Sequence, residues 1–214
     1  MEPDHSGEIE TSLRRYPSVK LVANKQTRKI MEGYFGDVSA NFMEVGDGDK
    51  LELGKHTLHF YLTPWVHWPE TMMTYEATEK ILFSADAFGT FGVTDGAATD
   101  ALTDVEVYEE EMRRYYSNIV GKYGMMVQKA LAKLSGLDVK TLCPLHGPVW
   151  SRQAGEVIGL YDTWSRGAAD TSPVIIYASM YKHPAPLPHP TSEPHPSHGP
   201  KRTRPTHYTK HQII

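Results

Sequence analysis

The 214-residue sequence predicts a layered α/β (α+β) domain, and three observations support this prediction. Short runs typical of strands are interspersed with amphipathic helical patterns along residues 1–170. Hydrophobic residues make up 40% of the chain, which is enough to bury one sizeable core. Strands and helices that mix along a chain pack as sheets covered by helices. We therefore expect a single layered domain over this part of the chain.

The N-terminal region predicts a helix, a strand and a second helix. Residues 8–16 have a helical pattern that ends at Pro17, which cannot continue a helix. Residues 19–23 alternate apolar and polar side chains like a strand. Residues 26–34 are helical again and end before Gly36. The last two elements form a strand–helix unit.

Five strand-like runs follow. Residues 42–45 and 50–53 are expected to pair as a β-hairpin, because the Gly-Asp-Gly-Asp sequence between them is typical of a turn. Residues 57–62 are a β-rich run that leads into a proline-containing loop. Residues 72–75 and 81–83 predict two further short strands.

The remaining elements are mainly helical. Residues 105–120 carry three glutamates near the start and two arginines later, an order that favours the helix dipole. Residues 125–134 predict a second helix, whose methionines are interpreted as core filling. Residues 139–143 predict a strand, and residues 154–166 predict another helix. Residues 174–178 are an apolar run typical of a parallel strand that is buried on both faces.

Composition excludes several classes of partner. No apolar run approaches the ~20 residues that span a bilayer, and the acidic N-terminus does not resemble a signal peptide. We therefore expect no membrane partner. The single cysteine, Cys143, agrees with a reducing, cytoplasmic location. The net charge of −4 gives no indication of nucleic-acid binding.

Two chemically reactive side chains directly follow predicted strands. His67 lies in the loop after residues 57–62, and Asp86 follows residues 81–83. Side chains at strand ends can be held rigidly, as metal ligands must be. The pair therefore predicts a metal site at this edge of the sheet.

The sequence contains the motifs EPDHSG at residues 2–7, HWPETM at 67–72 with ILFSADAFG at 81–89, and LCPLHGPVW at 142–150. These three motifs resemble those of the flavodiiron proteins, also called A-type flavoproteins. Members of that family carry a metallo-β-lactamase-like domain with two irons, fused to a flavodoxin-like domain. The resemblance implies an αββα sandwich of the metallo-β-lactamase type, and the order and separations of the motifs fit the family.

The resemblance also implies a di-iron ligand set. Asp86 would bridge the two irons. Glu2 and His67 would serve one iron, while Asp4 and His146 would serve the other. Carboxylate oxygen mixed with imidazole nitrogen gives a harder site than the His-rich sites of zinc hydrolases, and it suits iron or manganese. The full candidate set, with His5 beside the pair, is Glu2, Asp4, His5, His67, Asp86 and His146.

A reaction and its partners follow from the same resemblance. Two iron ions would bind O2 or NO, and the products would be water or N2O, with electrons delivered by FMN. Rubredoxin or a flavin reductase would be the electron donor, and the family forms a head-to-tail homodimer. Trp68, Tyr115 and Tyr116 are candidates for the pocket wall. Two alternatives stay open: a zinc-dependent metallo-β-lactamase-type hydrolase, and a non-catalytic fragment.

The chain departs from the family pattern at both ends. The family motif begins with a His that would precede Met1, so we expect an N-terminally incomplete sandwich. Residues 171–182 resemble the first strand of the flavodoxin-like domain, and the likeness stops at Tyr181. Prolines then replace the loop that would bind FMN, because proline lacks the N–H that contacts the phosphate. Residues 183–214 are rich in proline and histidine and are expected to be a disordered tail. We expect this truncation to impair activity.

Overall fold

The structure is a computed structural model that describes residues 1–37, 41–94, 96 and 98–167. The expected domain boundaries after residues 170 and 182 lie outside the described residues. The same is true of the strand predicted at residues 174–178 and of the proline- and histidine-rich tail.

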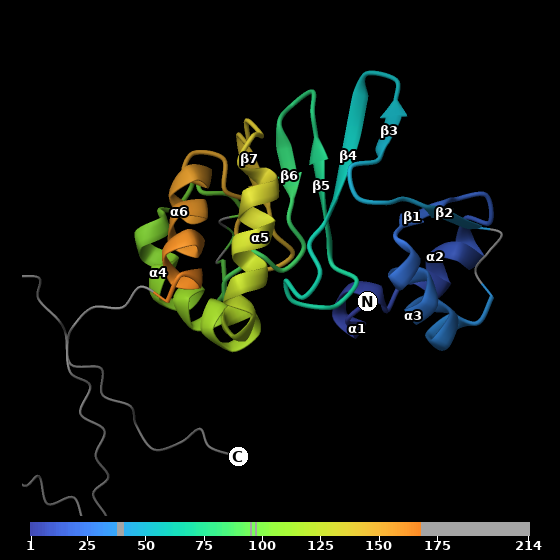
Figure 1. Cartoon of the computed structure of the whole chain (residues 1–214), viewed down its shortest axis with the longest axis horizontal. Coiled ribbons are helices and arrows are strands. Elements are labelled where there is room, and N and C mark those ends of the chain that lie inside the picture. Colours follow the sequence, from blue (N-terminus) through green and yellow to red (C-terminus); the bar gives the residue numbers. More distant parts are fainter. Residues whose placement is uncertain (38–40, 95, 97, 168–214) are drawn as a thin grey trace, which may run out of the picture. The chain divides into compact units, whose positions relative to one another are not determined.

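A β–α–β unit follows two short helices at the N-terminus (Figure 1). Its two strands are parallel, with Leu21 opposite Phe42, and the helix between them makes the crossover. The helix is capped by Asn24, whose side-chain oxygen accepts the N–H groups of Gln26 and Thr27. The elements are α1 (Pro3–Ser6), α2 (Ile9–Arg15), β1 (Leu21–Ala23), α3 (Lys25–Phe35) and β2 (Phe42–Glu44).

A five-stranded sheet with the order β3-β4-β5-β6-β7 forms the centre of the domain (Figure 1). Neighbouring strands are antiparallel, except for the last pair, β6 and β7, which is parallel. Strands β4, β6 and β7 therefore run in the same direction. The loops that follow them lie at the same end of the sheet, where these three strands finish. The strands are β3 (Lys50–Leu53), β4 (His56–Leu62), β5 (Met72–Glu76), β6 (Ile81–Phe83) and β7 (Thr141–Cys143).

The hairpin predicted between residues 42–45 and 50–53 is wrong. Strand β2 pairs with β1, and β3 pairs instead with β4, with Leu53 opposite His56. Only Gly54 and Lys55 separate these two residues, and Gly54 has a φ of 72°. A two-residue turn with glycine in the left-handed region is a strong hairpin signal. This local turn sets the pairing of β3, while the crossover through α3 sets the pairing of β2.

Three helices cover one face of the sheet (Figure 1). Buried side chains from β5, β6 and β7, such as Met73, Leu82 and Leu142, form a single core with Val127 and Val157 of the helices. The helix predicted over residues 105–120 is not continuous, because residues 116–120 form a π-helical turn. The helices are α4 (Val105–Tyr115), α5 (Gly124–Leu134) and α6 (Ala154–Ser165). Within the described ranges, none of the helices has both the length and the apolar character needed to cross a membrane.

Candidate metal centre

All six candidate ligands lie together at the end of the five-stranded sheet where β4, β6 and β7 finish. Three of them come from the loops that follow β4, β6 and β7, whose parallel directions bring those loops to the same place. The other three come from helix α1 and from the residue just before it. The candidate ligands on the loops are His67, Asp86 and His146, and those at the N-terminus are Glu2, Asp4 and His5.

Two of the ligand loops adopt uncommon backbone conformations. Trp65, two residues before His67, has a φ of 67°. Ala85 and Phe88, on either side of Asp86, have φ values of 53° and 68°. A non-glycine residue in the left-handed region is strained, and such strain persists where the surrounding structure fixes the backbone. These conformations turn the chain sharply after β4 and β6, next to the ligands.

The loop that carries His146 is held at both of its ends. Leu142 and Trp150 exchange two backbone hydrogen bonds of 2.8 and 2.9 Å, which close the loop. The backbone carbonyl of His146 accepts the N–H of Thr90 at 3.3 Å. Gly147 has a φ of 85°, and a Cβ atom at this position would lie 2.3 Å from the Thr90 side chain. Only glycine fits here without displacement, so Gly147 helps to fix the position of His146.

Asp100 anchors the short segment that joins the same loop to helix α6. Its fully buried carboxylate accepts backbone N–H groups of Ser151, Arg152 and Gln153 at distances of 2.7–3.0 Å. The Ser151 hydroxyl also donates to it at 2.8 Å. Burial opposes the charge, yet these hydrogen bonds hold the pKa of the Asp100 carboxyl below its ordinary value. The carboxylate therefore fixes residues 151–153, which join the His146 loop to α6, although Asp100 lies about fifty residues earlier in the chain.

One group of ligands combines an imidazole with two carboxylates. His67 Nε2 lies 3.1 Å from Glu2 Oε2 and 3.3 Å from Asp86 Oδ2. The ligand atoms of these three residues all lie within 4.8 Å of one another. Asp86 is 5% exposed, and His67 and Glu2 are partly buried, so the group lies at the boundary between core and solvent.

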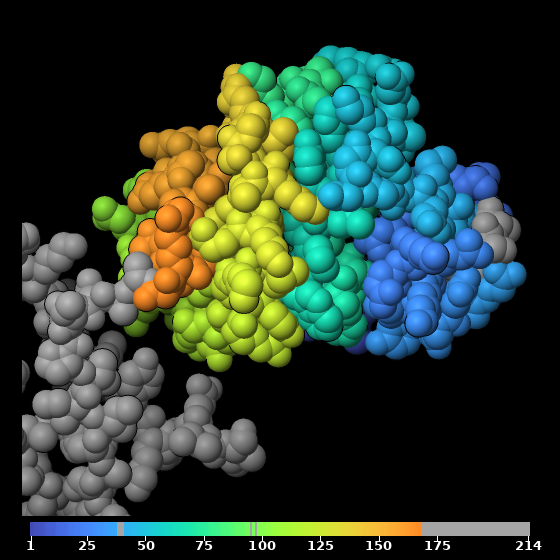
Figure 2. All heavy atoms as spheres, in the orientation of Figure 1, coloured from blue at the N-terminus to red at the C-terminus, as the bar shows by residue number. Residues whose placement is uncertain are grey.

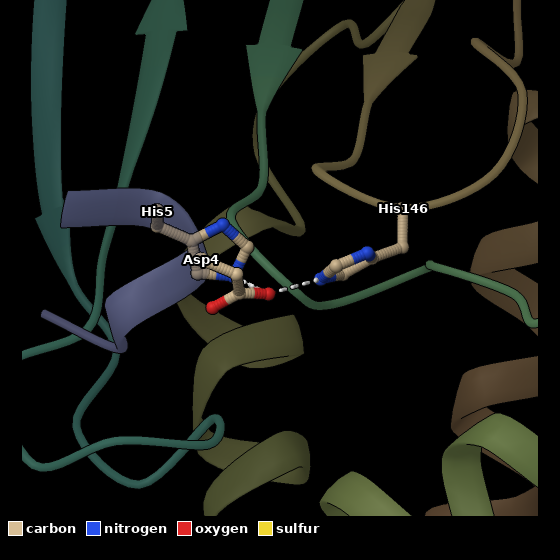
Figure 3. Close-up of side chains that lie close together, drawn as sticks. All are labelled: Asp4, His5 and His146. Carbon is tan, nitrogen blue, oxygen red and sulfur yellow. Dashed lines mark ion pairs between the residues drawn. The ribbon is translucent and has the colours of Figure 1, made fainter. Parts of the chain in front are cut away.

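A second group combines two imidazoles with a carboxylate (Figure 3). His146 Nε2 lies 3.5 Å from Asp4 Oδ2, and His5 Nε2 lies 3.6 Å from the same oxygen. The close-up shows Asp4 and His5 reaching from α1 towards the imidazole of His146 on its loop. The two imidazole rings are 5.0 Å apart, centroid to centroid.

Asp86 lies between the two groups and faces both of them. Its Oδ1 atom is 3.0 Å from His5 Nε2 and 3.4 Å from His146 Nε2. Its other oxygen, Oδ2, faces His67. A carboxylate that presents one oxygen to each of two ligand groups has the geometry of a bridging ligand.

Comparison with known proteins identifies the family. A family model described as "ODP family beta lactamase" matches residues 1–147. Solved structures of flavodiiron proteins share the fold over most of the chain. The chain belongs to the flavodiiron family. Its core therefore has the metallo-β-lactamase-like fold that the motifs implied, as a mixed α/β domain.

Two curated relatives illustrate the similarity. An uncharacterised protein of Methanocaldococcus jannaschii is 33% identical, over 85% of this chain and 45% of its own length. A nitric oxide reductase of Moorella thermoacetica is 28% identical, over 84% of this chain and 45% of its own length. The chain thus spans less than half the length of these relatives.

Two solved structures give the same result. A mutant of the flavo di-iron protein from Thermotoga maritima is 30% identical with a TM-score of 0.72, covering 78% of this chain and 41% of that one. The rubredoxin oxygen:oxidoreductase of Desulfovibrio gigas is also 30% identical with a TM-score of 0.72, covering 76% and 41%.

The donor atoms of this flavodiiron chain fit a pair of metal ions. Ligands bound at about 2.1 Å on adjacent positions of one ion lie about 3.0 Å apart. The imidazole–carboxylate distances of 3.0–3.6 Å in both groups are close to this value. Three imidazoles and three carboxylates form a donor set of intermediate hardness, which suits iron.

The three aromatic candidates for the pocket wall have different surroundings. The Tyr115 hydroxyl is buried and donates a hydrogen bond to Asp86 Oδ1 at 3.4 Å. Burial and the charge of Asp86 raise the pKa of Tyr115 well above its ordinary value, so it remains a donor. Trp68 lines a cavity of about 190 Å³ together with Glu2 and Asp86. Tyr116 is instead a core aromatic, packed against Tyr161 and Trp164.

Sequence reasoning missed two residues of this region. Glu70 lines the same cavity and is buried, and its Oε2 atom has no hydrogen-bond partner in the part of the chain that the structure describes. Its place in the HWPETM motif, three residues after His67, was an available signal. Asp100 offered no such signal, because its partners follow it by about fifty residues.

Proposed function

We propose that this chain is the di-iron part of a flavodiiron-type oxidoreductase, which reduces O2 to water, NO to N2O, or both, with electrons from FMN. The position of Asp86 is the observation that supports the proposal most directly. One carboxylate between two imidazole-containing groups supports a two-metal site, whereas a single-metal site would need only one of the groups.

Each of the two groups of candidate ligands would hold one of the two ions. Glu2 and His67 would hold one iron, Asp4 and His146 would hold the other, and Asp86 would bridge them. His5 lies 3.0 Å from Asp86 and would complete the second group. Bound iron would supply one-electron redox chemistry and open coordination positions for a diatomic substrate.

The surrounding residues would prepare the site for a small substrate. The cavity of about 190 Å³ beside Glu2 and Asp86 has room for a diatomic molecule, and Trp68, Met72 and Leu145 give it apolar walls. Tyr115 keeps its proton and donates to Asp86, which orients the bridging carboxylate.

Electrons would come from a flavin outside the described part of the chain, since the described residues contain no flavodoxin-like domain. Two relatives have names that point to the chemistry: one is a nitric oxide reductase and another a rubredoxin oxygen:oxidoreductase. By analogy, rubredoxin or a flavin reductase is the proposed donor. We also propose a head-to-tail homodimer for the complete assembly and a cytoplasmic location.

Metal analysis tests this proposal. The chain, purified and reconstituted with Fe(II) without oxygen, should bind two iron ions, and Asp86→Ala should lower the affinity of both. His67→Ala should lower the affinity for one iron ion more than the affinity for the other. The matched control is His59→Ala, because His59 lies on β4 outside both groups. Binding of zinc together with hydrolase activity would support a metallo-β-lactamase-type hydrolase instead. A chain that binds no metal would be a non-catalytic fragment.

A further inference from the structure

Strand β3 is the outermost strand of the five-stranded sheet (Figure 1). It pairs with β4 on one side, and its other edge pairs with no strand of the described residues. Lys50, Glu52 and Leu53 on this strand are exposed, and Leu51 is half-buried. Figure 2 shows the β3–β4 region at the molecular surface. A free strand edge presents backbone groups that can pair with another strand.

The hydrogen bonds of β4 determine which backbone groups are free. Phe60 accepts the N–H of Gly48 and donates to the carbonyl of Asp49, so its backbone groups point at β3. Backbone direction alternates along an antiparallel ladder, so Leu58, paired with Leu51, also points at β3. The N–H and C=O groups of Lys50 and Glu52 therefore point away from β4, towards the free edge.

The sequence of β3 is complementary to itself in the antiparallel direction. If Leu51 lies on a two-fold axis, Lys50 lies opposite the partner's Glu52, and Glu52 lies opposite the partner's Lys50. These are the residues whose backbone groups point outward, so each pair can form two backbone hydrogen bonds and one ion pair. Neither Lys50 nor Glu52 has an ion-pair partner among the described residues. Leu51 would meet the partner's Leu51 on the opposite face of the sheet.

We propose that two copies of the chain associate through their β3 edges and form a continuous ten-stranded sheet. Opposite charges two residues apart favour a second copy over an unrelated strand, because an antiparallel partner matches them only if it carries Lys and Glu in the same sequence order. Leu53, 56% exposed, would lose contact with water beside the same interface. Since β3 has only four residues, the dimer should be weak and depend on concentration.

This surface lies at the opposite edge of the sheet from β7, the strand that delivers His146. It also differs from the head-to-tail arrangement that the family resemblance implies. Association through β3 should therefore leave metal binding unchanged, and the inference stands independently of the proposed reaction.

Sedimentation velocity over a range of protein concentrations tests the proposal. Lys50→Glu alone, or Glu52→Lys alone, places like charges opposite each other at two symmetric positions and should weaken the dimer about tenfold. The double variant Lys50→Glu/Glu52→Lys restores opposite charges and should recover the original dissociation constant. Glu110→Lys, on the exposed surface of α4, is the matched control and should have no effect.

Circular dichroism should show that all four variants keep the wild-type fold. Higher salt should weaken the wild-type dimer, because the ion pairs are solvent-exposed. A chain that stays monomeric at every concentration would overturn the proposal. A dimer whose dissociation constant is unchanged in both single-reversal variants would also overturn it. The same holds if the double variant does not recover the wild-type dissociation constant.

Discussion

Gly147 determines where the imidazole of His146 lies. Its φ of 85° and the close approach of Thr90 leave no space for a side chain. Gly147→Ala should therefore lower the free energy of unfolding by about 1–3 kcal/mol, and it should move His146 away from Asp4 and Asp86. Iron titration should reveal weaker binding at one of the two positions.

Gly155→Ala is a suitable control for this substitution. Gly155 lies in α6, and no atom lies within 4 Å of the position that a Cβ would occupy there, so alanine should be tolerated or slightly stabilising. If both variants bind iron like the wild type, the close contact between Gly147 and Thr90 does not hold His146 in place.

Asp100 should make stability depend on acid pH. Its folded-state pKa is below the ordinary value of about 3.9, so its contribution is complete above that value and is lost as the pH falls through the folded-state pKa. Asp100→Asn should lower the free energy of unfolding by about 1–3 kcal/mol at neutral pH, because it removes a charged acceptor from four donors.

Denaturant unfolding at several pH values measures this effect. The difference between Asp100→Asn and the wild type should narrow below about pH 4. Glu110→Gln, at an exposed position, should differ little from the wild type at any pH. A difference that stays constant from neutral to strongly acid pH would contradict the role assigned to the Asp100 charge.

At the level of elements, the turn between β3 and β4 depends on Gly54. Its φ is 72° and the space around it is open, so alanine there would be strained without any steric clash. Gly54→Ala should destabilise the domain by about 1 kcal/mol. Gly33→Ala in α3, where the space is also open and φ is not in the left-handed region, should instead stabilise it by about 0.4–1 kcal/mol. Thermal unfolding of both variants would give opposite shifts in Tm, and equal shifts would contradict this account.

The accuracy of the sequence predictions varied with the range of the interactions involved. Helices α3, α5 and α6 and strands β5 and β6 were located to within a few residues, because local periodicity and end signals determine them. The pairing of β2 was wrong, since a parallel partner across a helix leaves no local signal. The π-helical turn at residues 116–120 was missed for a similar reason: the buried packing of Tyr116 against Tyr161 and Trp164 involves a distant helix.

The candidate site was predictable to the extent that its residues lie in compact motifs. His67, Asp86 and His146 each directly follow a strand, and the structure brings them together because β4, β6 and β7 run in the same direction. Their role as metal ligands stays a prediction. The support of Asp100 for the His146 loop could not be predicted, because it depends on a contact between segments about fifty residues apart.

At the scale of the whole molecule, metal binding and turnover should be separable. The six candidate ligands all lie within residues 2–146, in the part of the chain matched by the family model. The FMN that the proposed reaction would use has no binding domain among the described residues. The 214-residue chain should therefore bind iron but show little or no NADH-linked consumption of O2 or NO.

A stepwise reconstitution measures this separation. The iron-loaded chain, reduced chemically, should react once with O2 or NO, as followed by the loss of its Fe(II) signal. Adding a flavin reductase alone should not sustain turnover, because the described residues include no flavodoxin-like domain that would hold a flavin close to Asp86. Joining the chain to a flavodoxin-like domain that binds FMN should give turnover. Robust NADH-linked reduction by the 214-residue chain with its natural redox partner would show that electrons reach the irons without that domain.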